Sequence, residues 1–226
     1  MGTFPEMMLL RICLLAGSGF YDFVKSNVRI NNSAIGIIEK CGDSYVDPEK
    51  VAELLDMVAR HMKMTVDQED GHQTTAIECM TNTIEHASGN QPSRKCEKKW
   101  WFSVYYDTRN NVAKFAFVDT GIGIFESLKR RRFPLFGSIK RSEILKLLLA
   151  DSTDRNSIKP KDRTSTKLSH RGKGLPNIAR RNRLRIISNN VYADVENNQY
   201  LMMEQNFSGS IICWKYSTQN HEQHDD

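Results

Sequence analysis

The chain has 226 residues, of which 39% are hydrophobic and 26% charged, a balance typical of globular proteins. Its 13 glycines and 6 prolines exclude a collagen-like or low-complexity chain, and no apolar run reaches the roughly 20 residues that a membrane-spanning helix needs. The net charge of +5 is uneven, because residues 125–173 carry 14 Lys and Arg residues against five Asp and Glu residues. Such a segment either attracts phosphate or an acidic partner, or forms a solvated loop.

The cysteines form no CxxC pair and no regular spacing, which favours a reducing compartment over a disulfide framework. We therefore expect a cytoplasmic protein that does not contact a membrane. The five cysteines are Cys13, Cys41, Cys79, Cys96 and Cys213.

The first half of the chain predicts two helices after a weakly patterned segment, residues 1–44. Asp47 is a good N-cap and Pro48 a good first helical residue, and apolar residues then recur at helical spacing. A second helix is predicted from about Asp70 to Ala87. The expected core stripes are Val51, Leu54, Leu55, Val58, Ala59 and Met62 in the first helix, and Ala76, Ile77, Met80, Ile84 and Ala87 in the second.

The second half predicts strands in pairs, with helices between the pairs. Strands are expected at Trp100–Asp107, Val112–Asp119, Leu184–Val195 and Tyr200–Tyr216, and helices at Ser138–Ala150 and from Gly172 to about Asn182. Short connections between consecutive strands favour antiparallel pairing. The order of the elements therefore predicts an α+β two-layer sandwich with helices on one face of the sheet.

Three polar motifs stand out, and each has an ordinary structural explanation when taken alone. The second helix carries a polar face formed by Glu78, Asn82, Glu85 and His86, which any amphipathic helix could show. Asp119, Gly121 and Gly123 follow an apolar strand, where the carboxylate could accept a hydrogen bond from an amine and the glycines could admit a planar ligand, or where all three could form a turn. Gly172-Lys173-Gly174-Leu175 begins a helix, and could face an anion or form a flexible loop.

The three motifs in this order resemble the N box and the two glycine boxes of the GHKL (Bergerat-fold) ATP-binding superfamily. Phe207-Ser208-Gly209-Ser210 is similar to the element that closes the adenine pocket in that superfamily. The resemblance covers about residues 48–216. It implies the Bergerat fold, with a mixed, mostly antiparallel sheet, and ATP and Mg²⁺ as ligands. We expect an ATP-binding domain over residues 45–216, an N-terminal extension of unknown role over residues 1–44, and a disordered tail over residues 217–226.

The resemblance also implies a role for each site residue. Asn82 would ligate Mg²⁺ on the phosphates, with Glu85 and His86 on the same helix face. Asp119 would read the adenine amine with support from Ser210, and Gly121 and Gly123 would admit the adenosine. Gly172, Lys173, Gly174 and Leu175 would form the phosphate side, and residues 125–171 the ATP lid.

Glu78 is the residue that separates the branches of the superfamily. A carboxylate at this place in the N box resembles the hydrolytic branches and the anti-sigma-factor serine kinases, in which it is the general base. The expected activity is therefore ATP hydrolysis or phosphoryl transfer to a protein Ser or Thr. Two alternatives remain open, a non-hydrolysing module in which ATP orders the basic lid for a protein partner, and a nucleic-acid-associated ATPase using Lys129–Arg132. The sequence leaves the oligomeric state open.

Overall fold

The computed structural model describes residues 35–42, 45–86, 100–130, 137, 139–150 and 174–217. Within these residues, five strands form one sheet in the order β1-β2-β3-β5-β4, and its four strand pairs are antiparallel. The strands are β1 Ile35–Gly42, β2 Trp100–Asp107, β3 Val112–Asp119, β4 Arg185–Asp194 and β5 Gln199–Ser217. The expected α+β class is confirmed, and among the described strands the sheet is antiparallel rather than mixed.

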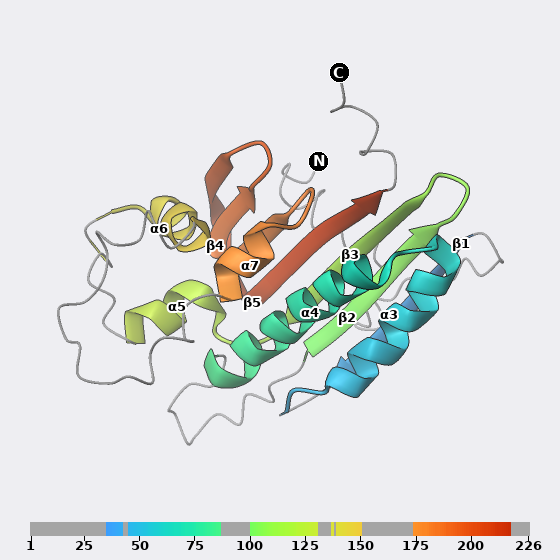
Figure 1. Cartoon of the computed structure of the whole chain (residues 1–226). Helices are drawn as coiled ribbons and strands as arrows, with labels where there is room; N and C mark the ends of the chain where they lie inside the picture. Colours follow the sequence, from blue (N-terminus) through green and yellow to red (C-terminus); the bar gives the residue numbers. More distant parts are fainter. Residues whose placement is uncertain are drawn as a thin grey trace.

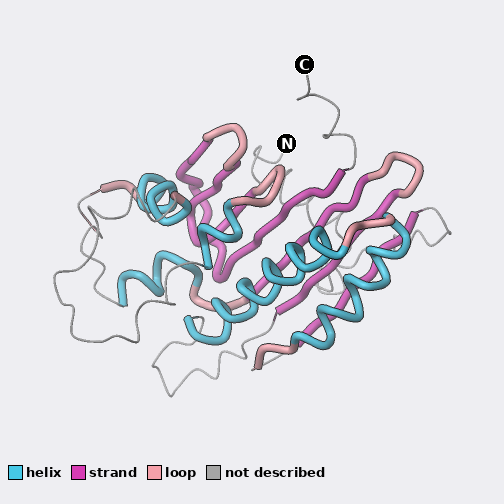
Figure 2. The backbone as a smooth tube through the Cα atoms, viewed as in Figure 1, coloured by secondary structure: helices cyan, strands magenta, loops and turns pink. Residues whose placement is uncertain are grey.

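Five helices accompany the sheet in the described part of the chain. They are α3 Pro48–Met62, α4 Val66–His86, α5 Gly123–Arg130, α6 Arg141–Leu149 and α7 Gly174–Ala179. Figures 1 and 2 show α3 and α4 running side by side across one face of the sheet, with α7 alongside α4 and α5 beyond the end of α4. None of the described helices is long and apolar enough to cross a membrane.

Helix α3 forms as its sequence predicts. The Asp47 side chain accepts a hydrogen bond from the Lys50 amide at 3.1 Å, and Pro48 occupies the first turn, where a missing N–H group costs nothing. All six residues of the predicted apolar stripe are buried.

Helix α4 begins at Val66, four residues before the predicted start. Thr65 and Gln68 form a reciprocal capping box, since the Gln68 amide donates to Thr65 Oγ1 at 3.3 Å and the Thr65 amide donates to Gln68 Oε1 at 2.9 Å. In its predicted core stripe, Ala76 and Met80 are fully buried, while Ile77 and Ile84 are half-buried. The predicted last residue, Ala87, lies outside the described residues.

Strand β1 and helices α5 and α7 also differ from the predictions. Strand β1 was not predicted, because its stability comes from pairing with β2 along its whole length rather than from a local pattern. Helix α5 was not predicted either, and its first amides bond to side chains of β4. Helix α7 ends at Ala179 rather than near Asn182, and the amides of Arg180 and Arg181 then bond to carbonyls three residues earlier, in a turn that leads to β4.

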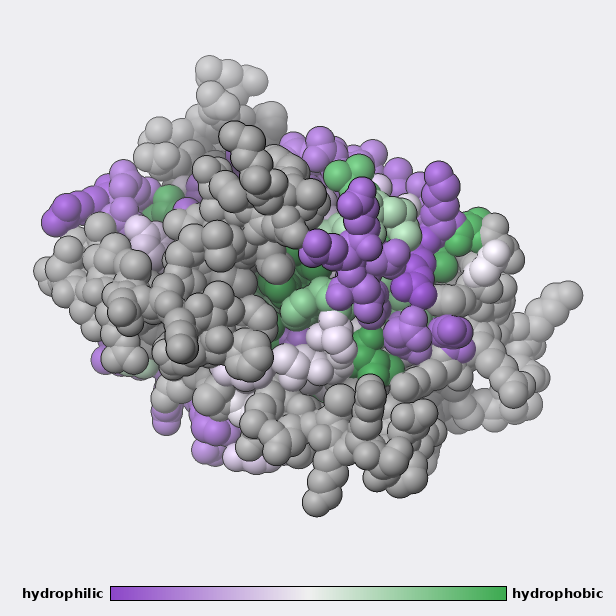
Figure 3. All heavy atoms as spheres, turned by 180° about the vertical axis from the view of Figure 1, so that it is seen from behind, coloured by the Kyte–Doolittle hydropathy of each residue, from purple (hydrophilic) through white to green (hydrophobic). Residues whose placement is uncertain are grey.

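The main hydrophobic core lies between the helices and one face of the sheet. Phe115 and Trp214 stack there on neighbouring strands, with ring centroids 5.2 Å apart and planes inclined by 4°. A smaller cluster of Val118, Ile187, Tyr192 and Ile211 lies on the opposite face. Figure 3 views the molecule from that side, where hydrophobic residues are visible between polar ones. Helix α4 contacts both β3 and α7, and its polar residues Glu78 and Asn82 lie against the start of α7.

Candidate functional site

The polar face of α4 meets the first residue of α7. Glu78 and Asn82 lie one turn apart on α4, and both are half-buried. A Cβ atom placed on Gly174 would lie 2.7 Å from Glu78 Oε2 and 3.6 Å from Asn82 Nδ2. Any larger residue at position 174 would push into the carboxylate. The structure thus brings together two motifs that are about 90 residues apart in the sequence.

Asp119 ends β3 and is only 7% exposed. Its Oδ1 atom accepts a hydrogen bond from the Gly121 amide at 2.8 Å. Ser210, directly opposite on β5, lowers the pKa of the same carboxylate through its hydroxyl and its backbone amide. Burial nevertheless raises the pKa of Asp119 from 3.8 to about 6, because the hydrogen bonds only partly offset the lost hydration of the charge.

Cys79 of α4 lies close enough to Asp119 and Glu78 for both carboxylates to affect its thiol. This thiol is 1% exposed, and burial raises its pKa well above 9.0, with further contributions from the negative charges of Asp119 and Glu78. Cys79 therefore lies within electrostatic reach of both carboxylates. The Asp119 motif and the Glu78 motif belong to the same region of the molecule.

The segment Phe207–Ser210 packs against the turn after β3. Ser208 Oγ donates to the Gly121 carbonyl at 3.1 Å. Gly209 has a φ of 123°, and a Cβ atom there would collide with the backbone carbonyl of Asp119. The glycine at position 209 thus allows β5 to approach the end of β3.

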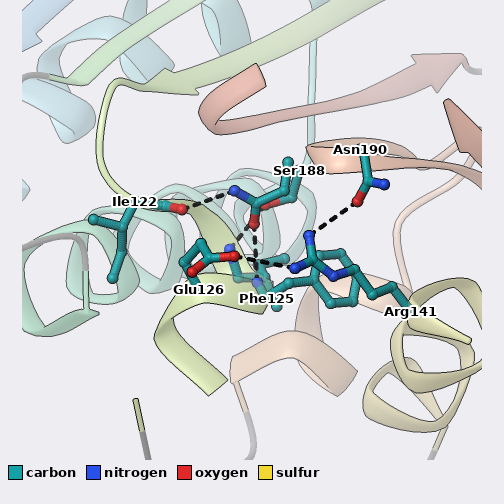
Figure 4. A network of polar contacts seen from close by, with 8 residues as sticks. Ile122, Phe125, Glu126, Arg141, Ser188 and Asn190 are labelled. Atoms are coloured by element: carbon teal, nitrogen blue, oxygen red, sulfur yellow. Dashed lines mark hydrogen bonds and ion pairs between the residues drawn. The ribbon is translucent and has the colours of Figure 1, made fainter. Parts of the chain in front are cut away.

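Ser188 and Asn189 of β4 are site residues that the sequence analysis missed. Ser188 Oγ accepts from the Ile124 amide at 2.8 Å, and Asn189 Oδ1 accepts from the Phe125 amide at 3.1 Å. Figure 4 shows this network beside the start of α5. A signal was present, because Ser188-Asn189-Asn190 interrupts an otherwise apolar strand, and polar residues inside a strand often mark irregular pairing.

Several predicted site residues are not tested by the described coordinates. Gly172 and Lys173 lie outside the described residues, as does most of the predicted lid. Glu85 and His86 lie in the last turn of α4, but their side chains are outside the described part. Leu175 follows Gly174 in α7 and packs against the main core. Within the predicted lid, α5 and α6 contribute Phe125, Ile144 and Leu145 to that core.

The described residues contain no group of three or more His, Cys, Asp or Glu side chains that could hold a metal ion. Mg²⁺ bound to nucleotide phosphates needs few protein ligands, because phosphate oxygens and water complete its coordination. The side-chain amide of Asn82, beside the Glu78 carboxylate and the space left by Gly174, offers the hard oxygen chemistry that Mg²⁺ prefers.

No family model matches the chain, and no curated protein matches it significantly.

Proposed function

We propose that this chain binds ATP with Mg²⁺ where α4, the end of β3 and α7 meet, and that it hydrolyses the nucleotide or transfers its γ-phosphoryl group to a protein Ser or Thr. The observation that carries the proposal is the close approach of Gly174 to both Glu78 and Asn82. Together with the buried Asp119, this contact unites the three motifs whose order resembles that of the GHKL superfamily.

The adenine end of the nucleotide is assigned to Asp119. An ionised carboxylate in a largely buried setting is a strong acceptor for an exocyclic amine. The Gly121 amide bonds to one oxygen of the carboxylate, and Ser210, directly opposite on β5, lowers the pKa of the carboxyl group through its hydroxyl and amide. These contacts orient the acceptor before any ligand arrives, which reduces the ordering cost of binding.

The phosphate end is assigned to Asn82 and Gly174. The Asn82 side-chain oxygen would hold Mg²⁺, which neutralises charge on the phosphates when it is bound. Gly174 has no side chain to occupy the space in front of Glu78.

Glu78 is proposed as the general base. Its carboxylate takes the proton of an attacking water or Ser/Thr hydroxyl as that oxygen forms a bond to the γ-phosphorus. The bond from the γ-phosphorus to the β–γ bridging oxygen breaks, and ADP leaves with the electron pair. The choice between water and a protein hydroxyl as acceptor depends on what reaches Glu78.

A second function is favoured by the position of α5. This helix begins at Gly123, inside the glycine motif, and continues into the basic segment. Arg141 of α6 then bonds to Glu126 of α5 at 3.1 Å and to Asn190 of β4 at 3.0 Å. Nucleotide contact at Gly123 could therefore be transmitted to the basic segment, which would make the protein an ATP-gated module for an acidic protein partner.

The test is a turnover assay with γ-labelled ATP, comparing the unmodified chain with Glu78→Gln. Label released as phosphate by the unmodified chain, and lost in Glu78→Gln, supports hydrolysis. Label retained on an added protein supports a kinase. Glu204→Gln, an exposed position on β5, is the matched control and should leave turnover unchanged. Equal turnover in Glu78→Gln would refute the assignment of the base.

A further inference from the structure

The pairing of β4 with β5 becomes irregular at Asn189. The strand register shifts on both sides of this residue, between Ser188 and Asn189 and again before Val191. Asn189 adopts a left-handed conformation with φ of 51°, yet it is only 1% exposed. Asparagine tolerates this conformation better than most residues, but a buried side chain there must still find partners for both of its polar atoms.

The side chain of Asn189 finds those partners in the turn that follows Asp119. Its Nδ2 atom donates to the Ile122 carbonyl at 2.9 Å, and its Oδ1 atom accepts from the Phe125 amide at 3.1 Å. One amide group thus joins the residues before and after Gly123. The conformation of this turn is therefore set from β4 as well as from the turn's own sequence.

The backbone of Gly123 packs directly against the side chain of Asn189. It has a φ of 77°, and a Cβ atom at this position would lie 2.5 Å from Asn189 Oδ1. The resemblance assigns Gly123 to the admission of adenosine, whereas the structure gives a requirement for glycine within the protein itself. The Asn189 side chain therefore occupies the space that a side chain at position 123 would need.

Ser188 extends the connection to the buried carboxylate. Its hydroxyl donates to the Gly209 carbonyl at 3.1 Å and lies 3.0 Å from Ser210 Oγ. Ser210 in turn lies directly opposite Asp119 in the pairing of β3 and β5. Consecutive residues of β4 thus hold the two sides of the predicted adenine pocket, the carboxylate through Ser188 and the glycine turn through Asn189.

We infer that Asn189 is a positioning residue for purine recognition, which fixes the turn Gly121–Phe125 relative to Asp119 so that the carboxylate meets the exocyclic amine. This inference rests on the proposed function. It predicts that loss of the Asn189 side chain reduces discrimination between purines. Affinity for the phosphates should change less, because the side-chain hydrogen bonds of Asn189 go to Ile122 and Phe125, which lie in the turn and the start of α5 rather than in α4 or α7.

The experiment compares the affinities of the unmodified chain and Asn189→Gly for ATP and for inosine triphosphate, which lacks the exocyclic amine. Glycine accepts the left-handed backbone, so the variant removes the two hydrogen bonds without adding strain. Because the turn is then no longer held relative to Asp119, the preference for ATP over inosine triphosphate should fall by about tenfold. Asn198→Gly is the matched control, since Asn198 has a φ of 50° in an exposed turn.

Amide hydrogen exchange supplies a second readout that needs no nucleotide. Exchange at Phe125 should accelerate in Asn189→Gly, while Ile124, which bonds to Ser188, should change less. Unchanged exchange at Phe125, or equal weakening of both nucleotides, would overturn the inference. Failure of the unmodified chain to bind ATP would instead refute the proposed function, and with it the role in purine recognition. The two failures are therefore distinguishable.

Discussion

Asp119 and Ser210 face each other across β3 and β5, and the hydroxyl and amide of the serine lower the pKa of the buried carboxylate against the effect of its burial. Stability alone would favour an apolar or neutral residue at such a position, because burying a charge costs free energy. The pKa of Asp119, raised to about 6, is a measure of that cost. We therefore expect the Asp119 carboxylate to lower the stability of the fold while it contributes to ligand binding.

We predict that Asp119→Asn raises the free energy of unfolding near pH 8. The pKa of Asp119 is higher in the folded chain than its ordinary value of 3.8, so stability falls as pH rises from about 4 to about 6 and stays lower above that range. The difference between the two pKa values corresponds to about 3 kcal/mol. Denaturant titrations at several pH values test this, and a variant less stable than the unmodified chain at pH 8 would contradict it.

Two glycines with positive φ provide a matched pair for substitution. Gly209→Ala places a Cβ atom against the carbonyl of Asp119, whereas Gly137→Ala, with φ of 95°, meets no heavy atom within 4 Å. Gly137→Ala should cost only the conformational strain, about 1 kcal/mol. Gly209→Ala should cost clearly more, since the three atoms nearest to the added Cβ atom all belong to the backbone of Asp119 and Thr120. Thermal unfolding measures the loss of stability in each variant. Equal losses in the two variants would mean that β5 can move away from β3 to make room for the added Cβ atom.

His72 should make the fold sensitive to acid. It is buried, its Nδ1 atom accepts from Trp214 Nε1 at 3.0 Å, and burial together with the charge of Arg181 lowers its pKa from 6.5 to about 3. Its contribution to stability is complete above about pH 6.5 and is lost as the pH falls, by at most about 1.4 kcal/mol per pH unit.

His72→Asn isolates this effect, because the Asn amide oxygen can replace Nδ1 as the acceptor without titrating. The stability of this variant should change less between pH 6.5 and pH 4 than that of the unmodified chain. Asp119 has the opposite pH dependence over part of this range, so the difference between the two chains is the quantity to measure. A difference that does not vary with pH would refute the assignment to His72.

Gly174→Ala should impair turnover more than stability. Alanine suits a helix better than glycine, but its Cβ atom would displace the Glu78 carboxylate. A double-mutant cycle with Glu78→Ala measures the coupling, and the alanine at position 174 should have little further effect on turnover once the carboxylate is gone. Additive effects of the two changes would indicate that Gly174 acts independently of Glu78.

The sequence predicts those elements whose causes are local. Asp47 and Pro48 define the start of α3, and the strands β2 and β3 match their predicted bounds. The start of α4 was also encoded locally, in the capping box of Thr65 and Gln68, and was missed because the apolar pattern begins later. Strand β1 depends on its partner β2, so its own residues did not reveal it.

The same distinction applies to the candidate site. Glu78, Asn82, Asp119 and Gly174 were singled out from motif spacing, and the structure brings them into one region. Asn189 was missed, because its role arises from contacts with residues more than 60 positions earlier in the chain. The reason for glycine at position 123 could not be read from the turn itself, since it depends on the Asn189 side chain.

The most direct test of the account is the binding of Mg·ATP to the unmodified chain and to Asp119→Asn, measured calorimetrically near pH 8. We expect one ATP per chain for the unmodified protein, and affinity at least about tenfold weaker for Asp119→Asn, even though that variant should be the more stable of the two. Weaker binding by a variant that is more stable would show that the carboxylate contributes to ligand recognition. Equal affinity in the two chains, or no binding by the unmodified chain, would contradict the central claim.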